Sequence, residues 1–251
     1  MLFDSLNLSF TAYCFALLGA VSLGFSKTGF PGLALVNVVI MAELFGAKDS
    51  VGLILPLLIV CDLGVYPLFA RYAKWRDAWP LIGIAVVGVV IGYFVLDYLD
   101  NQYARMAIGG VILTMLLLQL IRQFYPQLLG QVEGARWFRW WSGLLIGTST
   151  MLANAAAPAY SIYTLVNRYT KEQFLGIGAR CFLFLNVFKA PLMVNLDIIT
   201  RRSLLIDLCL LPGLAAGIFV GRKVIHRIPQ KAFEALLYFF SAVAGVRLLF
   251  F

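Results

Sequence analysis

Apolar runs of up to membrane-spanning length follow one another along the whole chain, and this pattern argues against an ordinary soluble fold. Hydrophobic residues make up 62% of the 251 residues and charged residues only 13%, with a mean hydropathy of +0.90. A soluble domain is about 25% charged, whereas a helix that crosses a bilayer needs about 20 apolar residues. We therefore predict an all-α, multi-pass membrane protein with about ten transmembrane or half-membrane helices. The predicted helices cover about 8–26, 30–43, 50–71, 78–97, 104–121, 137–153, 156–167, 173–195, 203–222 and 231–251.

Residues of the first five runs recur in the second five runs at an offset of 123 to 125 positions. Small insertions in a duplicated unit produce such a slowly drifting offset. We predict a first repeat over residues 1–122, an inter-repeat loop over 123–136 and a second repeat over 137–251. The matching pairs are Gly24 and Gly147, Ser26 and Ser149, Lys48 and Lys171, Gly52 and Gly176, Asp62 and Asn186, Pro67 and Pro191, and Gly92 and Gly217.

The charge distribution favours five membrane crossings in each repeat over four crossings with a re-entrant hairpin. Five is odd, so the second repeat would be inverted relative to the first. This arrangement places twelve Lys and Arg residues on one side of the membrane and five on the other, in keeping with the excess of positive charge in cytoplasmic loops. We predict two inverted five-helix repeats in the inner (plasma) membrane, with both termini outside. The net charge of +8 then needs no nucleic-acid partner.

The first helix break is the most informative stretch, because Lys27 interrupts a run that is otherwise apolar. A charged residue at membrane depth costs about 3 kcal/mol on insertion scales and usually faces a cavity or a partner. Gly29 and Pro31 break the helix beside it, and the N–H groups that start the next half-helix favour an anion. We predict that Ser26, Lys27, Thr28 and Gly29 bind an anionic substrate. The alternative is a kinked helix end from which Lys27 reaches the membrane interface.

The second repeat carries a similar break, in which hydroxyl and amide groups replace the lysine. Ser149, Thr150 and Asn154 can hydrogen-bond an oxyanion, and Pro158 suits the first turn of the following half-helix. We predict these three polar residues as substrate ligands. The alternative is that small polar residues help helices pack.

Four further ionisable or amide residues lie within apolar runs of the two repeats. Asp62 lies mid-run, and its counterpart Asn186 shares a helical face with Lys189 and follows Arg180. We predict that Arg180, Asn186 and Lys189 coordinate substrate and that Asp62 couples transport to protons. An ion pair of Asp62 with Lys27, Arg180 or Lys189 is the structural alternative. Three cations against one carboxylate favour an anionic substrate.

No grouping in the sequence points to catalysis. The single histidine, His226, lies in a basic loop, and the four cysteines, expected to be buried free thiols, form no Cys-x-x-Cys pair. We predict no cofactor, no metal site and no enzymatic activity. The expected partners are a small anionic substrate, the lipid bilayer and, as an open option, a second copy in a homodimer. An anion channel and a membrane-embedded enzyme are the rival functions.

The chain resembles the sulfite exporter TauE/SafE family over nearly its whole length and in both repeats. The family implies a bacterial-type inner-membrane transporter for sulfite, sulfonates or other small organosulfur or carboxylate anions, and hence an exporter that works by alternating access. Relatives typically carry a glycine before the proline of the second break, where this chain has Ala157, and this departure leaves the substrate open. The resemblance lies in Gly24 to Gly32, Lys48-Asp49-Ser50, Asn154 to Pro158, Lys171 to Phe174, Asn186 with Lys189, and Gly213 with Gly217.

Overall fold

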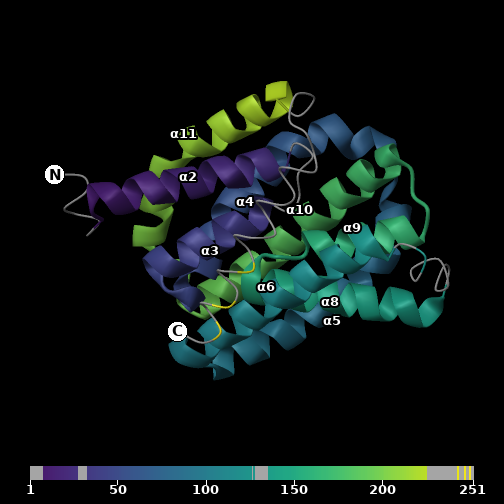
Figure 1. Ribbon diagram of the computed structural model, residues 1–251, viewed down its shortest axis with the longest axis horizontal. Helices are drawn as coiled ribbons and strands as arrows, with labels where there is room; N and C mark the ends of the chain where they lie inside the picture. The colour runs from purple at the N-terminus through teal and green to yellow at the C-terminus, as the bar shows by residue number, and fades with distance from the viewer. Residues whose placement is uncertain are drawn as a thin grey trace.

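The computed structural model describes residues 8–27, 33–125, 127, 135–224, 242, 246 and 249, and these residues form helices and no strands (Figure 1). The all-α prediction is therefore confirmed for the described part of the chain. Most of the predicted loop 123–136 and of the last predicted helix, 231–251, lies outside the described residues, as does the predicted position of both termini. The helices are α2 (Phe10–Ser26), α3 (Leu33–Phe45), α4 (Ala47–Phe69), the short 3-10 helix η1 (Ala70–Tyr72), α5 (Trp75–Tyr98), α6 (Asn101–Phe124), α8 (Arg136–Ala153), α9 (Ala157–Val166), α10 (Lys171–Asn195) and α11 (Arg201–Val224).

Local sequence signals set the ends of these helices. Gly46 separates α3 from α4 at φ +89°, a backbone conformation that glycine adopts without steric cost. The Asp100 side chain accepts from two first-turn N–H groups of α6. Thr170 and Gln173 cap the start of α10 reciprocally. These signals place the starts of α4, α6 and α10 two or three residues before the predicted apolar runs.

Four of the described helices are long and apolar enough to cross a membrane: 47–72, 75–98, 172–195 and 201–221. By contrast, α3 has 13 residues and α9 has 10. At 1.5 Å per residue, neither spans a hydrocarbon core of about 30 Å. The predicted helices 30–43 and 156–167 are therefore of half-membrane length. The four long apolar helices and the shorter apolar ones are typical of a multi-pass membrane protein.

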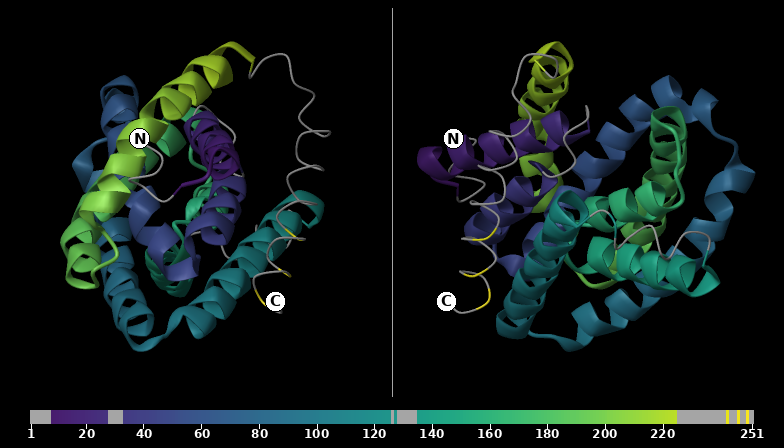
Figure 2. Two further views of the ribbon diagram at one scale, coloured as in Figure 1. Left: turned by 90° about the vertical axis from the view of Figure 1, so that its left-hand side faces the viewer. Right: turned by 45° about the vertical axis from the view of Figure 1, so that its right-hand side comes forward.

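Two pairs of helices pack through glycines, and each pair joins a helix of the first half to a helix of the second. Helix α11 lies along α2, and α5 lies along α8 (Figures 1 and 2). A methyl group at Gly147 would overlap the Ala85 carbonyl oxygen, and one at Gly217 would overlap that of Val21. Backbones approach this closely only where small residues lie at the crossing. The contacts ascend together in both pairs, which makes each pair parallel: Gly143 with Ile84, Gly147 with Gly88 and Gly92 with Met151; Leu17 with Gly213 and Val21 with Gly217.

Helices α4 and α10 form a central antiparallel pair. Gly52, near the start of α4, packs on Ile198, just after the end of α10. Gly176, near the start of α10, packs on Ala73 at the far end of the α4 segment. Each of these two glycines, which are matched in the predicted duplication, therefore packs at the far end of the other central helix.

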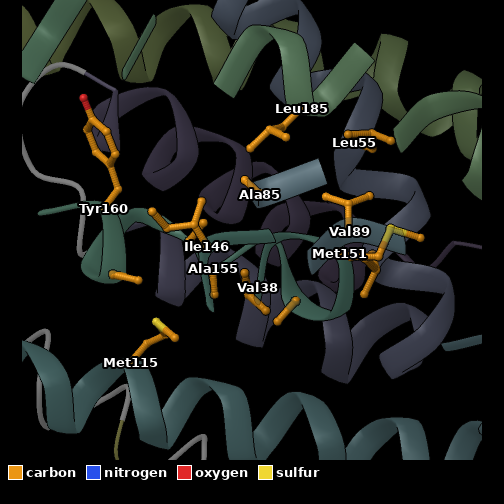
Figure 3. Packing of buried hydrophobic residues seen from close by; sticks show 14 of the residues in the cluster. Val38, Leu55, Ala85, Val89, Met115, Ile146, Met151, Ala155, Tyr160 and Leu185 are labelled. Atoms are coloured by element: carbon orange, nitrogen blue, oxygen red, sulfur yellow. The ribbon is translucent and has the colours of Figure 1, made fainter. Parts of the chain in front are cut away.

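Buried side chains from seven helices form one core around α8 and α9 (Figure 3). The labelled members include Val38 of α3, Leu55 of α4, Met115 of α6 and Met151 of α8. A second cluster lies between α2, α4 and α11. The four cysteines are free, but only Cys61 and Cys181 are buried. The prediction of a buried thiol is wrong for Cys14, which lies on an exposed face of α2.

Candidate functional site

A cavity of about 120 Å³ lies where the end of α2 and the α8–α9 break meet the central α4–α10 pair. A cavity of this volume has room for a small oxyanion, since one water molecule occupies about 30 Å³ of liquid. Aromatic and aliphatic residues make up most of the wall, and seven lining residues have polar side chains. The polar lining residues are Ser26, Lys27, Asp62, Thr150, Asn154, Tyr160 and Asn186.

An ion pair between Lys27 and Asp62 forms the charged part of the cavity wall. Lys27 caps the end of α2, and its ammonium group also lies 5.4 Å from the centre of the Phe182 ring. Asn186 Nδ2 donates to the second Asp62 oxygen at 2.6 Å. Asp62 is buried, whereas the Lys27 side chain is 19% exposed. The Asp62–Lys27 pairing was one of the expected alternatives, and the structure brings both residues into the same cavity as Asn186.

The second break is held in place by a lysine from α10. Asn154 ends α8 in a left-handed conformation at φ 52°, which asparagine tolerates better than most residues. Lys189 Nζ donates to Asn154 Oδ1 at 2.7 Å and to the Thr150 carbonyl oxygen at 2.9 Å. Asn154 Nδ2 donates in turn to the Val51 carbonyl oxygen of α4 at 2.9 Å. These bonds connect α8, α10 and α4 at one level of the molecule.

The start of α9 lies at the cavity wall through Ala156, Ala157 and Tyr160. First-turn N–H groups of a helix have no acceptor within the helix, and the helix dipole makes this end attractive to anions. Pro158 occupies the first turn, as predicted, where its missing N–H removes nothing from the helix. The cavity therefore combines a helix N-terminus with a lysine side chain.

The structure separates some of the predicted ligands from the cavity. The Ser149 hydroxyl donates to the Ile146 carbonyl oxygen within its own helix. The Arg180 guanidinium lies 5.7 Å from the ring centres of Tyr66 and Trp75, and Arg180 Nη1 donates to the Gly176 carbonyl oxygen. Neither side chain lines the cavity, and neither does Lys189. Ser26, Lys27, Thr150, Asn154 and Asn186 do line it, while Thr28 and Gly29 lie outside the described residues.

This separation changes the expected charge of the site. Among the described lining residues the ionisable groups of opposite charge are Lys27 and Asp62, so their ion pair leaves the wall neutral. The expected excess of positive charge does not face the cavity, because Arg180 stacks on aromatic rings and Lys189 binds the end of α8. A neutral pair accepts an anion only when one partner changes its charge or its position.

The aromatic residues of the cavity wall were not among the predicted ligands. Phe69, Phe174 and Phe182 line it together with Tyr160, whose hydroxyl donates to the Phe174 carbonyl oxygen at 2.6 Å. Phe182 lies one helical turn before Asn186 on the same face of α10, so helical spacing from a predicted ligand could have identified it. Spacing alone does not distinguish such a residue from a lipid-facing phenylalanine.

The sequence model of one protein family, described as sulfite exporter TauE/SafE, matches residues 14–248, nearly the whole chain. The match includes both helix breaks and the central α4–α10 pair. No curated protein and no solved structure matches the chain.

Proposed function

The chain belongs to the sulfite exporter TauE/SafE family, and we propose that it moves small sulfur-containing oxyanions, such as sulfite or sulfonates, by secondary transport. The family implies a membrane transporter of the sulfite or sulfonate exporter type. The choice of substrate, the coupling to protons and the alternating-access mechanism are our proposals. Transport rather than catalysis agrees with the family and with the apolar, helical build of the chain.

The observation that carries this proposal is the neutral Lys27–Asp62 pair in a cavity whose other described lining residues are uncharged. An unpaired charge is costly at membrane depth, so the empty site is most stable with the pair formed. A monovalent oxyanion can replace Asp62 as the partner of Lys27 if Asp62 takes up a proton. The N-terminus of α9 and the Thr150 hydroxyl, which both reach the cavity wall, would bind the remaining oxygens.

Asn186 fits this exchange. Its Nδ2 donates to the ionised Asp62 carboxylate at 2.6 Å, while its Oδ1 has no partner among the described residues. When Asp62 is protonated, a rotation of the amide turns Oδ1 toward the new carboxyl O–H. The same side chain can thus donate to the ionised form of Asp62 and accept from the protonated form.

This exchange couples one proton to one monovalent anion. The loaded site contains protonated Asp62, positive Lys27 and the anion, and the empty site contains the ion pair, so both have the same net charge. Transport is then electroneutral cotransport, and its direction follows the sum of the anion and proton gradients. Outward flux, as in an exporter, occurs when the outward anion gradient exceeds the inward proton gradient.

We propose that the two halves are inverted repeats that expose the site alternately to the two sides of the membrane. Support comes from the antiparallel α4–α10 pair, in which counterparts Asp62 and Asn186 contact one another. Two helices that are antiparallel and make equivalent contacts are related by a two-fold axis perpendicular to both. For helices that cross the membrane, such an axis lies in the membrane plane, which is the geometry of inverted repeats.

The orientation follows from the basic residues at one end of the α4–α10 pair. We call this end the basic face; it carries Arg71, Lys74 and Arg76 after α4 and Arg168 before α10. The excess of Lys and Arg in cytoplasmic loops supports an inner (plasma) membrane location with the basic face in the cytoplasm. The opposite end carries Lys48, Asp49, Asp197 and Arg201.

Counterflow in proteoliposomes tests the proposed function. Vesicles loaded with unlabelled sulfite should transiently accumulate labelled sulfite, and a small sulfonate should replace sulfite on either side. Chloride and uncharged solutes of similar size should not replace sulfite. Counterflow requires a carrier, so simple equilibration without overshoot would favour an anion channel. Absence of counterflow with both sulfite and sulfonates would refute the assigned substrate class.

A further inference from the structure

The cavity is closed at the end away from the basic face. On α4, one helical stripe passes through Phe69, Val65, Asp62 and Leu58, which all line the cavity. The next residues on this stripe at i−3 and i−4 spacing are Leu55 and Val51, which are buried and do not line it. The open part of the α4 stripe therefore stops between Leu58 and Leu55.

Helix α10 shows the same boundary. Its stripe passes through Leu175, Gly178, Phe182 and Asn186, which line the cavity, and continues to Lys189. Lys189 is 0% exposed, whereas the Lys27 side chain is 19% exposed. Both central helices thus lose their contact with the cavity at the level where Lys189, Asn154 and Val51 meet.

A hydrogen-bond network closes this level. Lys189 Nζ donates to Thr150 Oγ1 at 3.0 Å in addition to its bonds to the Thr150 carbonyl and to Asn154 Oδ1. Asn154 Nδ2 extends the network to the Val51 carbonyl of α4. Three acceptors satisfy all three donors of the buried ammonium, so the network is complete without a ligand.

We propose that this network, formed by Lys189, Thr150, Asn154 and the Val51 carbonyl, is the latch that keeps the cavity closed toward the face opposite the basic one. This inference rests on the alternating access proposed above and assigns Lys189 a positioning role in place of substrate binding. A second pocket, of about 420 Å³ and lined by Asp49, Leu53 and Asp197 among others, lies at that opposite end of α4 and α10. Release of the latch would let the cavity open on this side.

The energetics suit a latch. A hydrogen bond to a charged group is stronger than a neutral one, and a buried ammonium that loses its acceptors is strongly destabilised. The closed state therefore persists until the end of α8 and helix α10 move apart. In the open state, water that enters from the opposite face would replace the lost acceptors of Lys189.

Two-sided labelling of a cysteine at Leu58 tests the latch. Leu58 lines the cavity just below the closed level, so Leu58→Cys reports which face connects to the site. An impermeant maleimide is applied to right-side-out and to inside-out membrane vesicles. Labelling is measured by mass spectrometry, and the labelling of the same protein with Leu58 retained is subtracted as background. The otherwise unchanged protein should react from the basic face and only slowly from the opposite face.

Lys189→Met should raise the labelling rate from the opposite face about tenfold, as expected when a closed state loses bonds to a charged group. Asn154→Ala removes the Val51 bond and one Lys189 bond, and should shift labelling the same way. Lys48→Met is the matched control, because Lys48 binds the Leu99 carbonyl at the opposite face and not the latch. Labelling of Leu58→Cys from the opposite face should not change in the Lys48→Met protein.

Lys189→Met and Asn154→Ala are compared as far as each elutes as a folded species. If labelling from the opposite face does not increase in such a variant, the latch is refuted. The labelling needs no substrate. Increased opposite-face labelling in a protein that transports neither sulfite nor sulfonates would therefore support the latch and refute the substrate class. Normal transport with unchanged labelling would refute the latch alone.

Discussion

Asp62 and Asn186, which are matched in the predicted duplication, contact one another in the central α4–α10 pair: Asn186 Nδ2 lies 2.6 Å from Asp62 Oδ2. The two matched positions thus carry a carboxylate on α4 and an amide on α10. A carboxylate in both halves would place two like charges side by side in a buried site, which is unfavourable. The difference between the two positions leaves one carboxylate at this contact, and Lys27 forms its ion pair.

The Asp62→Asn variant should separate anion transport from proton coupling. The amide is nearly isosteric and neutral, so it imitates the protonated carboxyl and leaves Lys27 available to the anion. We expect counterflow to persist and net uptake to lose its response to an imposed pH gradient. Flux measured with and without a pH gradient, at equal anion gradients, checks this outcome.

Two results would contradict the assignment of Asp62. Retention of the full response to the pH gradient in Asp62→Asn would show that another group carries the proton. A loss of folding would be uninformative by itself, because Lys27 would lose its ion-pair partner. The double variant Lys27→Met with Asp62→Asn removes both charges and should restore a folded protein without transport.

A second prediction concerns the glycine at the α5–α8 crossing. Gly147→Ala places a methyl group against the Ala85 carbonyl oxygen and should cost about 1–3 kcal/mol of stability, as overpacking does. Gly83→Ala on α5 is the control, because nothing lies within 4 Å of the added methyl group, and it should gain up to about 1 kcal/mol from helix propensity. Thermal unfolding in detergent compares the stability of the two variants. Equal unfolding midpoints would contradict the close packing of α5 on α8 at Gly147.

A third prediction concerns membrane orientation. The Arg76 side chain is 80% exposed at the start of α5, and Gln102 is exposed at the start of α6. Because α5 crosses between them, Arg76→Cys and Gln102→Cys should react with an impermeant maleimide from opposite sides, Arg76→Cys from the cytoplasm. Labelling of both from one side would contradict a membrane crossing by α5. The reverse pattern would keep the fold and invert the orientation.

Much of the fold could be predicted from the sequence because a bilayer imposes helix length directly. The apolar runs located every described helix to within a few residues, and Pro158 marked the start of α9 for reasons of backbone geometry. The offset between matching residues paired Gly52 with Gly176 as repeat counterparts but predicted no contact for either. It indicated duplication, but not that each glycine packs on the far end of the opposite helix.

The candidate site was harder to predict, since helical spacing gives a residue's face and depth but not its partner. Lys27, Asp62 and Asn186 were identified as intramembrane polar residues, and the structure brings them together. Arg180 and Lys189 have the same sequence signature, but aromatic rings surround one and the end of α8 binds the other. Such partners come from distant parts of the chain, so no local pattern reveals them.

The most direct test of the account measures counterflow of labelled sulfite and of a labelled small sulfonate in three forms of the protein: unchanged, Lys27→Met and Lys48→Met. Both lysines are partly buried cations, but Lys27 lines the cavity and Lys48 binds the Leu99 carbonyl. We predict counterflow for the unchanged protein and for Lys48→Met, and a loss of at least about 100-fold for Lys27→Met, the scale of a lost charge-assisted contact. Undiminished counterflow in a folded Lys27→Met protein would contradict an anion site at the Lys27–Asp62 pair.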